Sequence, residues 1–457
     1  MFDPRAIVSQ EVRHVPQTDI IELTAVEAAD AIARGLASAE EYTAACIERI
    51  ADADGEVQAF VHHDAENALA QARALDRLKA EGGRVGPLHG IPVGIKDIFD
   101  TADYPTEYGS QQLAGRRPQA DATVVRKLRE AGAVIIGKTV STEFAYFHPG
   151  PTRNPRDLAR TPGGSSSGSA AAVAAGMVPL AIGSQTNGSM IRPAAFCGVF
   201  GVKPSHGLVS RAGALTLSAK LDHVGAFARS LEDIALVLDV IAGQDPADPD
   251  TRPYAAPAFS AAASAELPVP PNFAFVRTPM WDKADAEARE GLEELAKDLG
   301  AREVEMPTGF AAAWDAQRVV MAAEMAHNLG NYADNGEVSA KFADLIAEGR
   351  AVTATQYLAA LRDARTYAEE TMAIFEQGTD AILTLSTRGV APLGIEATGD
   401  PVFCSFWSLT GMPALNLPIL ADDEGLPIGV QLVGAPGRDE KLLQTARGLL
   451  DILSDDG

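Results

Sequence analysis

The chain has 457 residues, 46% of them hydrophobic and 22% charged, which is the balance of a globular protein with a large buried core. Its formal net charge of −24 argues against direct nucleic-acid binding through a general electrostatic surface. The three cysteines, Cys46, Cys197 and Cys404, are too few and too scattered for a disulfide framework or a zinc site.

Targeting signals are not evident in the sequence. The segment Met1–Val8 has no basic stretch followed by an apolar one, so we expect no secretory signal. The chain also contains no run of about 18 apolar residues that would predict a membrane span. We therefore expect a cytoplasmic protein that does not bind a membrane.

The first elements alternate between helices and strands. Capping-box patterns begin at Thr24 and Ser38 and predict helices over 22–36 and 38–53. A third helix is predicted over Asp64–Glu81, ending at two glycines. The elements predicted next are a strand at Ile91–Ile98, a helix at Asp121–Ala131 and a strand at Ala133–Ile136.

Later segments continue the same alternation. Strands are predicted at Phe273–Val276, Ala381–Leu385 and Val430–Val433, and helices over 284–298, 311–332 and 354–376. Helices that alternate with short β-branched runs predict an α/β sheet covered on both faces. We see no internal repeat and no boundary between independent domains, so 1–457 is expected to be a single domain.

A lysine stands at the end of an apolar strand. The segment Gly90–Asp97 places Lys96 beside Ile91, Val93 and Ile95. A lysine is normally solvated, but these neighbours make its burial plausible. A buried neutral lysine can act as the base for a serine nucleophile when no histidine is placed for that role.

Two serines lie in glycine-rich segments downstream. Ser165 lies in the glycine- and serine-rich loop Thr161–Gly168, which leads into the helix-forming run Ala170–Ala175. Ser189 follows the turn Asn187-Gly188, 24 positions later. Alone, the first segment reads as a flexible linker and the second as a turn. Their joint occurrence with Lys96 favours catalysis.

Two short motifs match other enzyme classes without the context those classes need. Gly132–Thr139 fits the phosphate-loop pattern, but its interior is a buried strand rather than a loop. Gly164–Gly168 fits the nucleophile-elbow pattern centred on Ser166, but no strand precedes it. The histidines that follow, His206, His223 and His327, stand in no recognisable setting. We prefer neither interpretation.

The segments around Lys96, Ser165 and Ser189 together resemble the amidase signature family, whose centre is a Lys–Ser–Ser triad. The resemblance continues through Gly150–Pro155, Arg192–Gly198, Leu409–Leu415 and Gly425–Leu432. It covers most of 22–244 and 380–452, whereas 245–379 matches little. The chain departs from the family at Asn187, where a glycine is usual, and at Gln185, where many members have aspartate.

The resemblance implies one large α/β/α domain with a mixed central β-sheet flanked by helices. In it, 22–244 would form the catalytic core, 245–379 would shape the substrate site and 380–457 would complete the sheet. It also implies hydrolysis of a C–N bond through an acyl-enzyme, with no cofactor and no metal. His62, His63 and His148 show no ligand spacing, in agreement with the last point.

The same resemblance assigns roles to individual residues. Ser189 would be the nucleophile, Lys96 the base, and Ser165, which sits in a cis peptide bond in the family, the proton relay between them. The backbone N–H groups of Thr186, Asn187, Gly188 and Ser189 would form the oxyanion hole. The Asn187 side chain would crowd this site or hydrogen-bond within it.

The substrate is expected to be a small amide or carbamate, including urethane-like compounds and acyl amides, turned over by a monomer or homodimer. Aromatic residues supply the expected pocket: Phe99, Tyr146, Phe403, Phe406 and Trp407. For Phe406 and Trp407, packing in the core is an equally good interpretation.

Two other functions remain open. One is the glutaminase (A) subunit of a tRNA-dependent amidotransferase complex, in which partner subunits bind the tRNA. The turn Gln185–Gly188 is less like that branch. The other is a binding protein that has lost catalysis, which the presence of all three catalytic residue types disfavours.

Overall fold

Eleven strands form one mixed sheet in the order β1-β3-β2-β4-β6-β5-β10-β11-β9-β7-β8. The fold comes from a computed structural model that describes residues 20–253 and 258–455; the expected absence of a secretory signal at Met1–Val8 lies outside these residues. The strands are β1 (Phe60–His63), β2 (Pro92–Lys96), β3 (Val134–Thr139), β4 (Leu180–Gln185), β5 (Phe200–Lys203), β6 (His223–Ala228), β7 (Phe273–Arg277), β8 (Arg302–Glu305), β9 (Ala381–Leu385), β10 (Ala414–Ala421) and β11 (Pro427–Val433).

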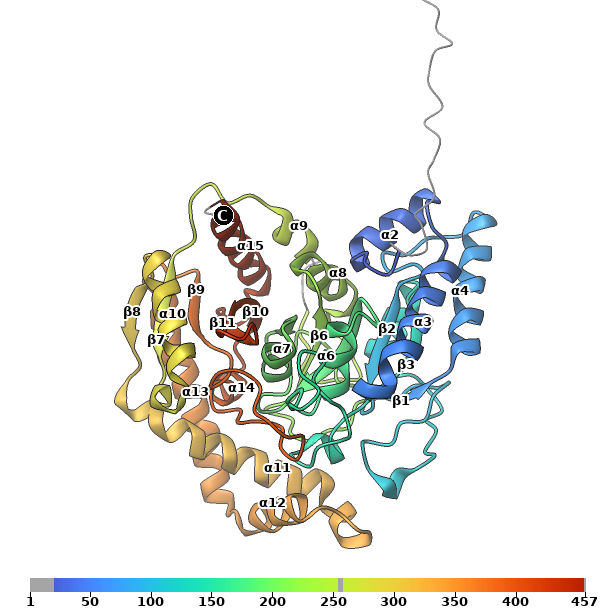
Figure 1. The fold of residues 1–457 in the computed structure, drawn as a ribbon. Coiled ribbons are helices and arrows are strands. Elements are labelled where there is room, and N and C mark those ends of the chain that lie inside the picture. The colour runs from blue at the N-terminus through green and yellow to red at the C-terminus, as the bar shows by residue number, and fades with distance from the viewer. Residues whose placement is uncertain (1–19, 254–257, 456–457) are drawn as a thin grey trace, which may run out of the picture.

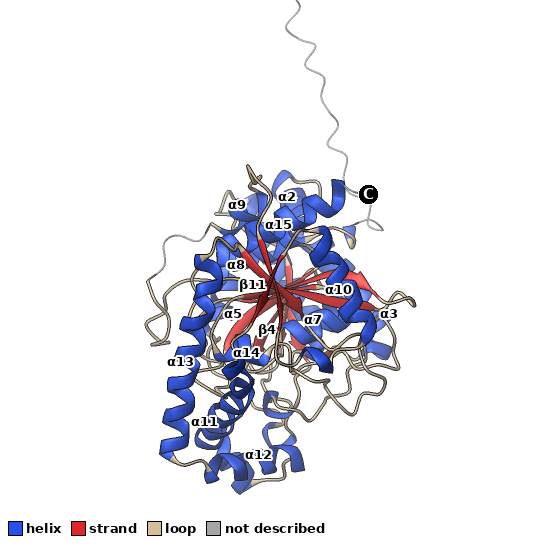
Figure 2. Cartoon of the chain, turned by 90° about the vertical axis from the view of Figure 1, so that its left-hand side faces the viewer, coloured by secondary structure: helices blue, strands red, loops and turns tan. Residues whose placement is uncertain are grey.

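Helices surround the sheet, as Figures 1 and 2 show. The α-helices are α2 (Ala25–Arg34), α3 (Ala39–Val57), α4 (Ala65–Ala80), α5 (Thr123–Glu130), α6 (Ser167–Ala174), α7 (Ile191–Cys197), α8 (Leu231–Ile241), α9 (Phe259–Ser264), α10 (Ala286–Asp298), α11 (Ala313–Asn335), α12 (Ala340–Ala351), α13 (Ala354–Glu376), α14 (Ser405–Leu409) and α15 (Asp439–Asp455). Short 3₁₀ helices are η1 (Gln111–Leu113), η2 (Glu143–Ala145), η3 (Trp281–Lys283) and η4 (Thr308–Ala312).

Both faces of the sheet are buried, as the alternation of strand β3 illustrates. Ile135 belongs to a core cluster with residues of α2, α5 and α8, whereas Val134 and Ile136 belong to one with residues of α3 and α6. Successive side chains of a strand point to opposite faces, so a strand with apolar residues at every position must be covered twice. The expected α/β/α architecture is confirmed.

Two groups of three strands pair in parallel, whereas the edge strand β1 pairs antiparallel with β3 and the central strands pair antiparallel with one another. Strands β3, β2 and β4 pair in parallel, and β9, β7 and β8 do the same at the other end. The strands between them, from β4 through β6, β5, β10 and β11 to β9, pair antiparallel. The C-terminal strands β9, β10 and β11 thus join the sheet, while β7 and β8 from the divergent segment form one edge.

The predicted capping boxes are present. Thr24 and Glu27 cap α2 reciprocally, and Ser38 and Glu41 do the same for α3. The segment that fits the phosphate-loop pattern is confirmed as strand β3 over Val134–Thr139. Strands β1, β4, β5, β6, β8 and β10 were not predicted, because these short runs show no clear period.

Long helices from the divergent segment form a layer at one end of the molecule. Helices α11, α12 and α13 pack against one another, and α11 also contacts α14 (Figures 1 and 2). This layer brings α11, one of the predicted helices, next to the loops that carry the candidate site.

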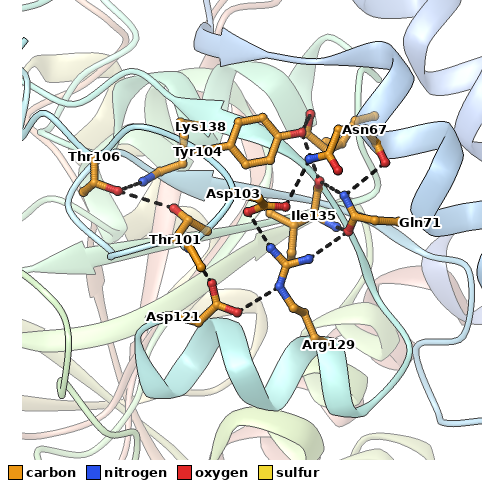
Figure 3. A network of polar contacts seen from close by, with 12 residues as sticks. Asn67, Gln71, Thr101, Asp103, Tyr104, Thr106, Asp121, Arg129, Ile135 and Lys138 are labelled. Carbon is orange, nitrogen blue, oxygen red and sulfur yellow. Dashed lines mark hydrogen bonds and ion pairs between the residues drawn. The ribbon is translucent and has the colours of Figure 1, made fainter. Parts of the chain in front are cut away.

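A polar network fixes the segment that follows β2 (Figure 3). Arg129 of α5 donates to Asp103 at 2.6 Å, to Asp121 at 3.0 Å and to Gln71 of α4 at 2.9 Å. Lys138 of β3 is fully buried and donates to the Phe99 carbonyl at 2.8 Å. Arginine and lysine thus tie the chain after Lys96 to the neighbouring strand and helices.

Candidate active site

Lys96 is the last residue of β2, inside the sheet between β3 and β4. Its side chain is fully buried, as the sequence predicted, and its Nζ lies 2.6 Å from Ser165 Oγ and 2.8 Å from Ser184 Oγ. Burial lowers the pKa of Lys96 well below its usual value, and the Asp222 carboxylate only partly opposes this shift. A neutral amine at this position can accept a proton.

Ser184 is a contact of Lys96 that the sequence did not reveal. It lies on β4, whose parallel pairing with β2 brings it beside Lys96. A serine within a strand has no distinctive spacing, so only the register of the two strands exposes its position. Ser166, the centre of the elbow pattern, instead donates to the Ser184 carbonyl at 3.0 Å and does not contact Lys96.

Ser165 is held by a tight loop before α6. Gly163 and Gly164 precede it with φ of 84° and 62°, a region that favours glycine. A Cβ on Gly164 would lie 2.8 Å from Pro193 Cδ and 3.2 Å from Ser189 Cα. The glycine therefore lets the loop of Ser165 approach the loop of Ser189 closely.

The expected cis peptide bond at Ser165 is not found. No peptide bond in the described residues is cis, and this includes the bond between Gly164 and Ser165. In this structure the two left-handed glycines turn the chain instead. The expectation of a cis bond was therefore wrong, whereas the expected contact between Ser165 and Lys96 is present at 2.6 Å.

Ser189 lies between β4 and α7, 8% exposed. The backbone N–H of Ser165 donates to Ser189 Oγ at 3.1 Å. No hydrogen bond joins the hydroxyls of these two described serines directly. The fold thus brings together three separate segments. Ser165 contacts Lys96 on one side and Ser189 on the other, which is the arrangement that the resemblance implied.

The backbone between β4 and α7 offers a row of N–H donors. The N–H groups of Thr186, Asn187, Gly188 and Ser189 donate to no other group in the described part of the chain. Gln185 shapes this turn, because its Oε1 accepts from the N–H groups of Met190 at 2.8 Å and Ile191 at 3.0 Å. Free, fixed donors beside a serine suit a developing oxyanion.

Asn187 is held against α14. Its Oδ1 accepts from Ser405 Oγ at 2.6 Å and its backbone carbonyl accepts from Ser408 Oγ at 2.7 Å. The hydrogen bond expected of this side chain is therefore made to the helix behind the turn. At Gly188 there is no room for a side chain, because a Cβ there would lie 2.8 Å from Pro401 and 3.2 Å from Cys404.

Thr186 is tied to a buried acid. Its Oγ1 donates to Asp222 Oδ1 at 2.6 Å, and the other carboxylate oxygen accepts from the N–H groups of Leu217 and Ser218 at 2.8 and 2.9 Å. Burial raises the pKa of Asp222 to about 6. Asp222 thus links the turn of the oxyanion donors to the surroundings of Lys96.

A small cavity of about 290 Å³ opens beside Ser189. Its walls are mostly apolar or aromatic, formed by Ala145, Tyr146, Phe147, Leu217 and Met321 of α11, together with Thr186, Asn187, Ser189 and Arg192. Tyr146 therefore lies where the sequence placed it, and the divergent helix reaches the site.

Arg192 is the charged group of this cavity. It is 2% exposed, donates to the Gly399 carbonyl at 2.9 Å and stacks its guanidinium 5.5 Å from the Phe147 ring centre. Its Nε has no hydrogen-bond partner among the described residues, and burial lowers the pKa of Arg192 to about 10. A buried guanidinium with an unused N–H can donate a hydrogen bond to an acceptor on a ligand.

The remaining predicted pocket residues separate into two groups. Phe99 lines a second, neighbouring cavity. Phe403, Phe406 and Trp407 line neither cavity: all three are buried, and Phe406 stacks on Phe310 at 5.1 Å. All three therefore pack in the core. Phe406 also lies 6.0 Å from the ring of Trp314 in α11, whereas Ser405 and Ser408 of α14 contact Asn187 in the turn.

Within residues 20–253 and 258–455, no three histidine, cysteine, aspartate or glutamate side chains group as ligands for a metal ion. In the same residues, no helix is long and apolar enough to cross a membrane.

Comparison with known proteins identifies the family. The family model described as amidase matches residues 41–443. The chain therefore belongs to the amidase family, and the resemblance drawn from its motifs is confirmed.

Curated relatives carry the name of an amidotransferase component. The A subunit of glutamyl-tRNA(Gln) amidotransferase from Moorella thermoacetica is 37% identical over 475 residues, covering 94% of this chain and 96% of that protein. The protein of the same name from Acidothermus cellulolyticus is also 37% identical, covering 94% of each chain.

Solved structures with the same fold are more varied. A chain of a vestigial protein complex connected with the origin of an s-triazine catabolic enzyme is 32% identical, with a TM-score of 0.87 over 94% of this chain and 98% of that one. Peptide amidase from Stenotrophomonas maltophilia is 31% identical, with a TM-score of 0.83 over 96% and 98% of the two chains. A 6-aminohexanoate cyclic dimer hydrolase is 27% identical, with a TM-score of 0.84 over 95% and 97%.

Proposed function

We propose that this chain hydrolyses the C–N bond of an amide or carbamate through an acyl-enzyme on Ser189. The observation that carries the proposal is the buried contact of Lys96 Nζ with Ser165 Oγ at 2.6 Å, beside a serine that faces free backbone donors. A lysine is charged in water at neutral pH, with a pKa near 10.4. Burial favours the neutral amine, which is the form that can act as a base.

The proposed reaction begins with the transfer of a proton from Ser165 to Lys96 as Ser165 takes one from Ser189. The Ser189 hydroxyl rotates from the Ser165 N–H toward the Ser165 hydroxyl to make this transfer. Ser189 Oγ then attacks the carbonyl carbon. The N–H groups of Thr186–Ser189 hold the oxyanion, where one such donor typically contributes about 3–4 kcal/mol.

The second half of the reaction returns the protons. Ser165 gives a proton to the leaving nitrogen and recovers one from Lys96, so the C–N bond breaks with a neutral amine as the product. Water then attacks the ester of Ser189 along the same route. No cofactor takes part in this scheme.

The cavity beside Ser189 supports a small substrate. Its apolar walls at Phe147, Leu217 and Met321 fit a short aliphatic or aryl acyl group, and the unused N–H of Arg192 fits an acceptor on that group. Met321 comes from the divergent segment, which supports its proposed role in shaping the substrate site. The similarity to a peptide amidase and to a cyclic dimer hydrolase supports hydrolysis of an amide by the chain on its own.

A second candidate is favoured by the names of the curated relatives. In it, the chain is the glutaminase component of a tRNA-dependent amidotransferase and works with partner proteins. Glutamine carries an α-carboxylate, which fits the Arg192 guanidinium, and an α-ammonium group, for which the described lining of the cavity at Ser189 includes no carboxylate. The sequence relatives thus support this candidate, and the cavity alone does not separate the two.

One assay separates the two. The purified chain is given L-glutamine, acetamide, an anilide and an aryl carbamate, and release of ammonia or amine is measured with wild type and the Ser189→Ala variant. Ser189-dependent turnover of the simple amides or the carbamate by the chain alone supports the first candidate. Turnover of glutamine alone, or only after partner proteins are added, supports the second.

A further inference from the structure

A second cavity lies next to the one at Ser189 and is the larger of the two. It holds about 830 Å³ of empty space, counting its open mouth, against about 290 Å³ for the first. Apolar residues form part of its buried lining, among them Ile98, Phe99, Leu215 and Val224. The exposed residues Ala247 and Pro249 also line it, so the cavity opens at the surface there.

This cavity adjoins the proton relay. Thr186 and Leu217 line both cavities, so the two are immediate neighbours. Ser184, which lies 2.8 Å from the Nζ of Lys96, lines the second cavity only. In the proposed reaction the leaving nitrogen takes its proton through Ser165, which contacts Lys96, so a leaving group must extend toward the relay.

His223 lines the second cavity and has an unused acceptor atom, which is itself buried. It is 3% exposed, and its Nδ1 lies 2.6 Å from the Leu221 carbonyl. A carbonyl accepts only, so Nδ1 carries the proton and Nε2 holds a free lone pair. Burial lowers the pKa of His223 well below its usual value, which keeps the ring neutral. Nε2 has no partner in the described residues, and a ligand N–H is the group that would satisfy it.

The charges of the lining favour an amine over an acid. Arg211 is the one cation among the lining residues, and it is paired with both Asp248 and Asp250. Asp222 adds a third carboxylate. The lining therefore carries an excess of negative charge, which attracts an ammonium ion and repels a carboxylate.

We propose that the second cavity binds the leaving group of the substrate, a primary amine or amide nitrogen with an apolar substituent. The inference rests on the proposed hydrolysis at Ser189. In it, the amide RC(O)NHR′ and the Ser189 hydroxyl give the acyl ester and R′NH2. The apolar R′ lies against Phe99 and Leu215, while an N–H donates to His223 Nε2. The released amine leaves past Ala247 and Pro249.

The test is a binding measurement with benzylamine as the probe, by calorimetry at pH 7. Four proteins are compared: wild type, His223→Phe, Ala214→Leu and His206→Phe. Ala214 lines the cavity, so leucine there occupies its space. His206 packs edge-on against His223 at 5.3 Å and does not line the cavity, so it is the matched control for the histidine change. Benzoate, of similar size and opposite charge, is the matched control ligand.

Benzylamine is expected to bind wild type and His206→Phe alike, and about tenfold more weakly to His223→Phe, the loss that one hydrogen bond produces. Ala214→Leu is expected to weaken binding as well, and benzoate is expected not to compete with benzylamine. Equal binding to all four proteins, or no saturable binding to wild type, overturns the inference.

This measurement does not depend on turnover. If the Ser189→Ala variant retains activity, the proposed function fails while benzylamine binding still decides the site. If hydrolysis depends on Ser189 but benzylamine does not bind, the leaving-group site alone fails. Circular dichroism of each variant checks that a loss of binding is not a loss of fold.

Discussion

Ser184 Oγ lies 2.8 Å from Lys96 Nζ, which gives the base a second hydroxyl partner besides Ser165. The amine is thus held from two sides in a fully buried site. In the proposed reaction this contact helps to hold the Lys96 amine against Ser165. We expect Ser184→Ala to retain the fold and to lose about tenfold in kcat, because the base is then less well oriented.

The matched control is Ser167→Ala. Ser167 is also buried and lies two positions from Ser165, but its hydroxyl reaches only the Val140 carbonyl at 3.5 Å. Near-normal activity in Ser184→Ala, or an equal loss in both variants, would show that Ser184 does not orient the base.

Replacing Lys96 is expected to impair amide hydrolysis more than ester hydrolysis. An alkoxide leaves with less need of a proton than an amide nitrogen does, so loss of the relay matters less for esters. The wild-type rate should rise with pH as the Lys96 ammonium loses its proton, at a pH below the usual lysine value. The ratio of amide to ester turnover and the pH–rate profile of Lys96→Ala are the measurements. An unchanged ratio and profile would exclude lysine as the base.

The buried lysine also predicts a pH-dependent stability. Between its lowered folded pKa and the unfolded value near 10.4, the unfolded chain binds the extra proton, so the stability rises with pH. Lys96→Met removes that slope and the cost of burying the amine. We expect its free energy of unfolding to exceed that of wild type, with the excess shrinking from pH 7 to pH 9. A constant difference across this range would contradict a lowered pKa.

Gly188→Ala is expected to abolish activity with a smaller effect on folding. The added Cβ would lie 2.8 Å from Pro401 and 3.2 Å from Cys404, so the turn that carries the oxyanion donors must shift. A displaced donor typically costs about 10²–10³-fold in kcat. Gly55→Ala, at a glycine whose Cβ position has nothing within 4 Å and whose φ lies outside the left-handed region, is the control for a glycine change as such. Normal kcat in folded Gly188→Ala would show that the turn is not the oxyanion site.

The aromatic residues of the two regions are expected to behave differently. Phe406 packs among Phe310, Trp314 and Tyr367, and replacing a core aromatic with alanine typically costs about 3–5 kcal/mol. Phe406→Ala should lower the melting temperature and all activities together. Tyr146→Ala should leave the melting temperature near that of wild type and change the ranking among anilide, carbamate and aliphatic amide substrates. The reverse pattern would move the substrate pocket to α14.

The triad could be predicted from the sequence because each member stands in a local pattern of its own. Lys96 ends an apolar strand, and Ser165 and Ser189 follow glycine turns at a fixed spacing. Burial of Lys96 followed from its apolar neighbours. These are short-range properties of the chain, so they can be recognised without knowing how the three segments pack against one another.

The contacts that hold the triad could not be predicted, because they depend on strand register and on long-range packing. Ser184 meets Lys96 only through the pairing of β4 with β2. Asn187 finds Ser405 of α14 across 218 positions of sequence. For Phe406 and Trp407 the sequence left pocket and core open, because the direction in which a short helix points its aromatic side chains depends on what packs against it.

The central claim is that Ser189 forms a covalent intermediate, and labelling with phenylmethylsulfonyl fluoride followed by peptide mass spectrometry tests it most directly. We expect a sulfonyl adduct on the peptide that contains Ser189, loss of activity in proportion to labelling, no adduct in Ser189→Ala, and slower labelling in Lys96→Ala. Labelling of Ser165 or Ser166 in place of Ser189, or full activity in a protein labelled at Ser189, would contradict the account.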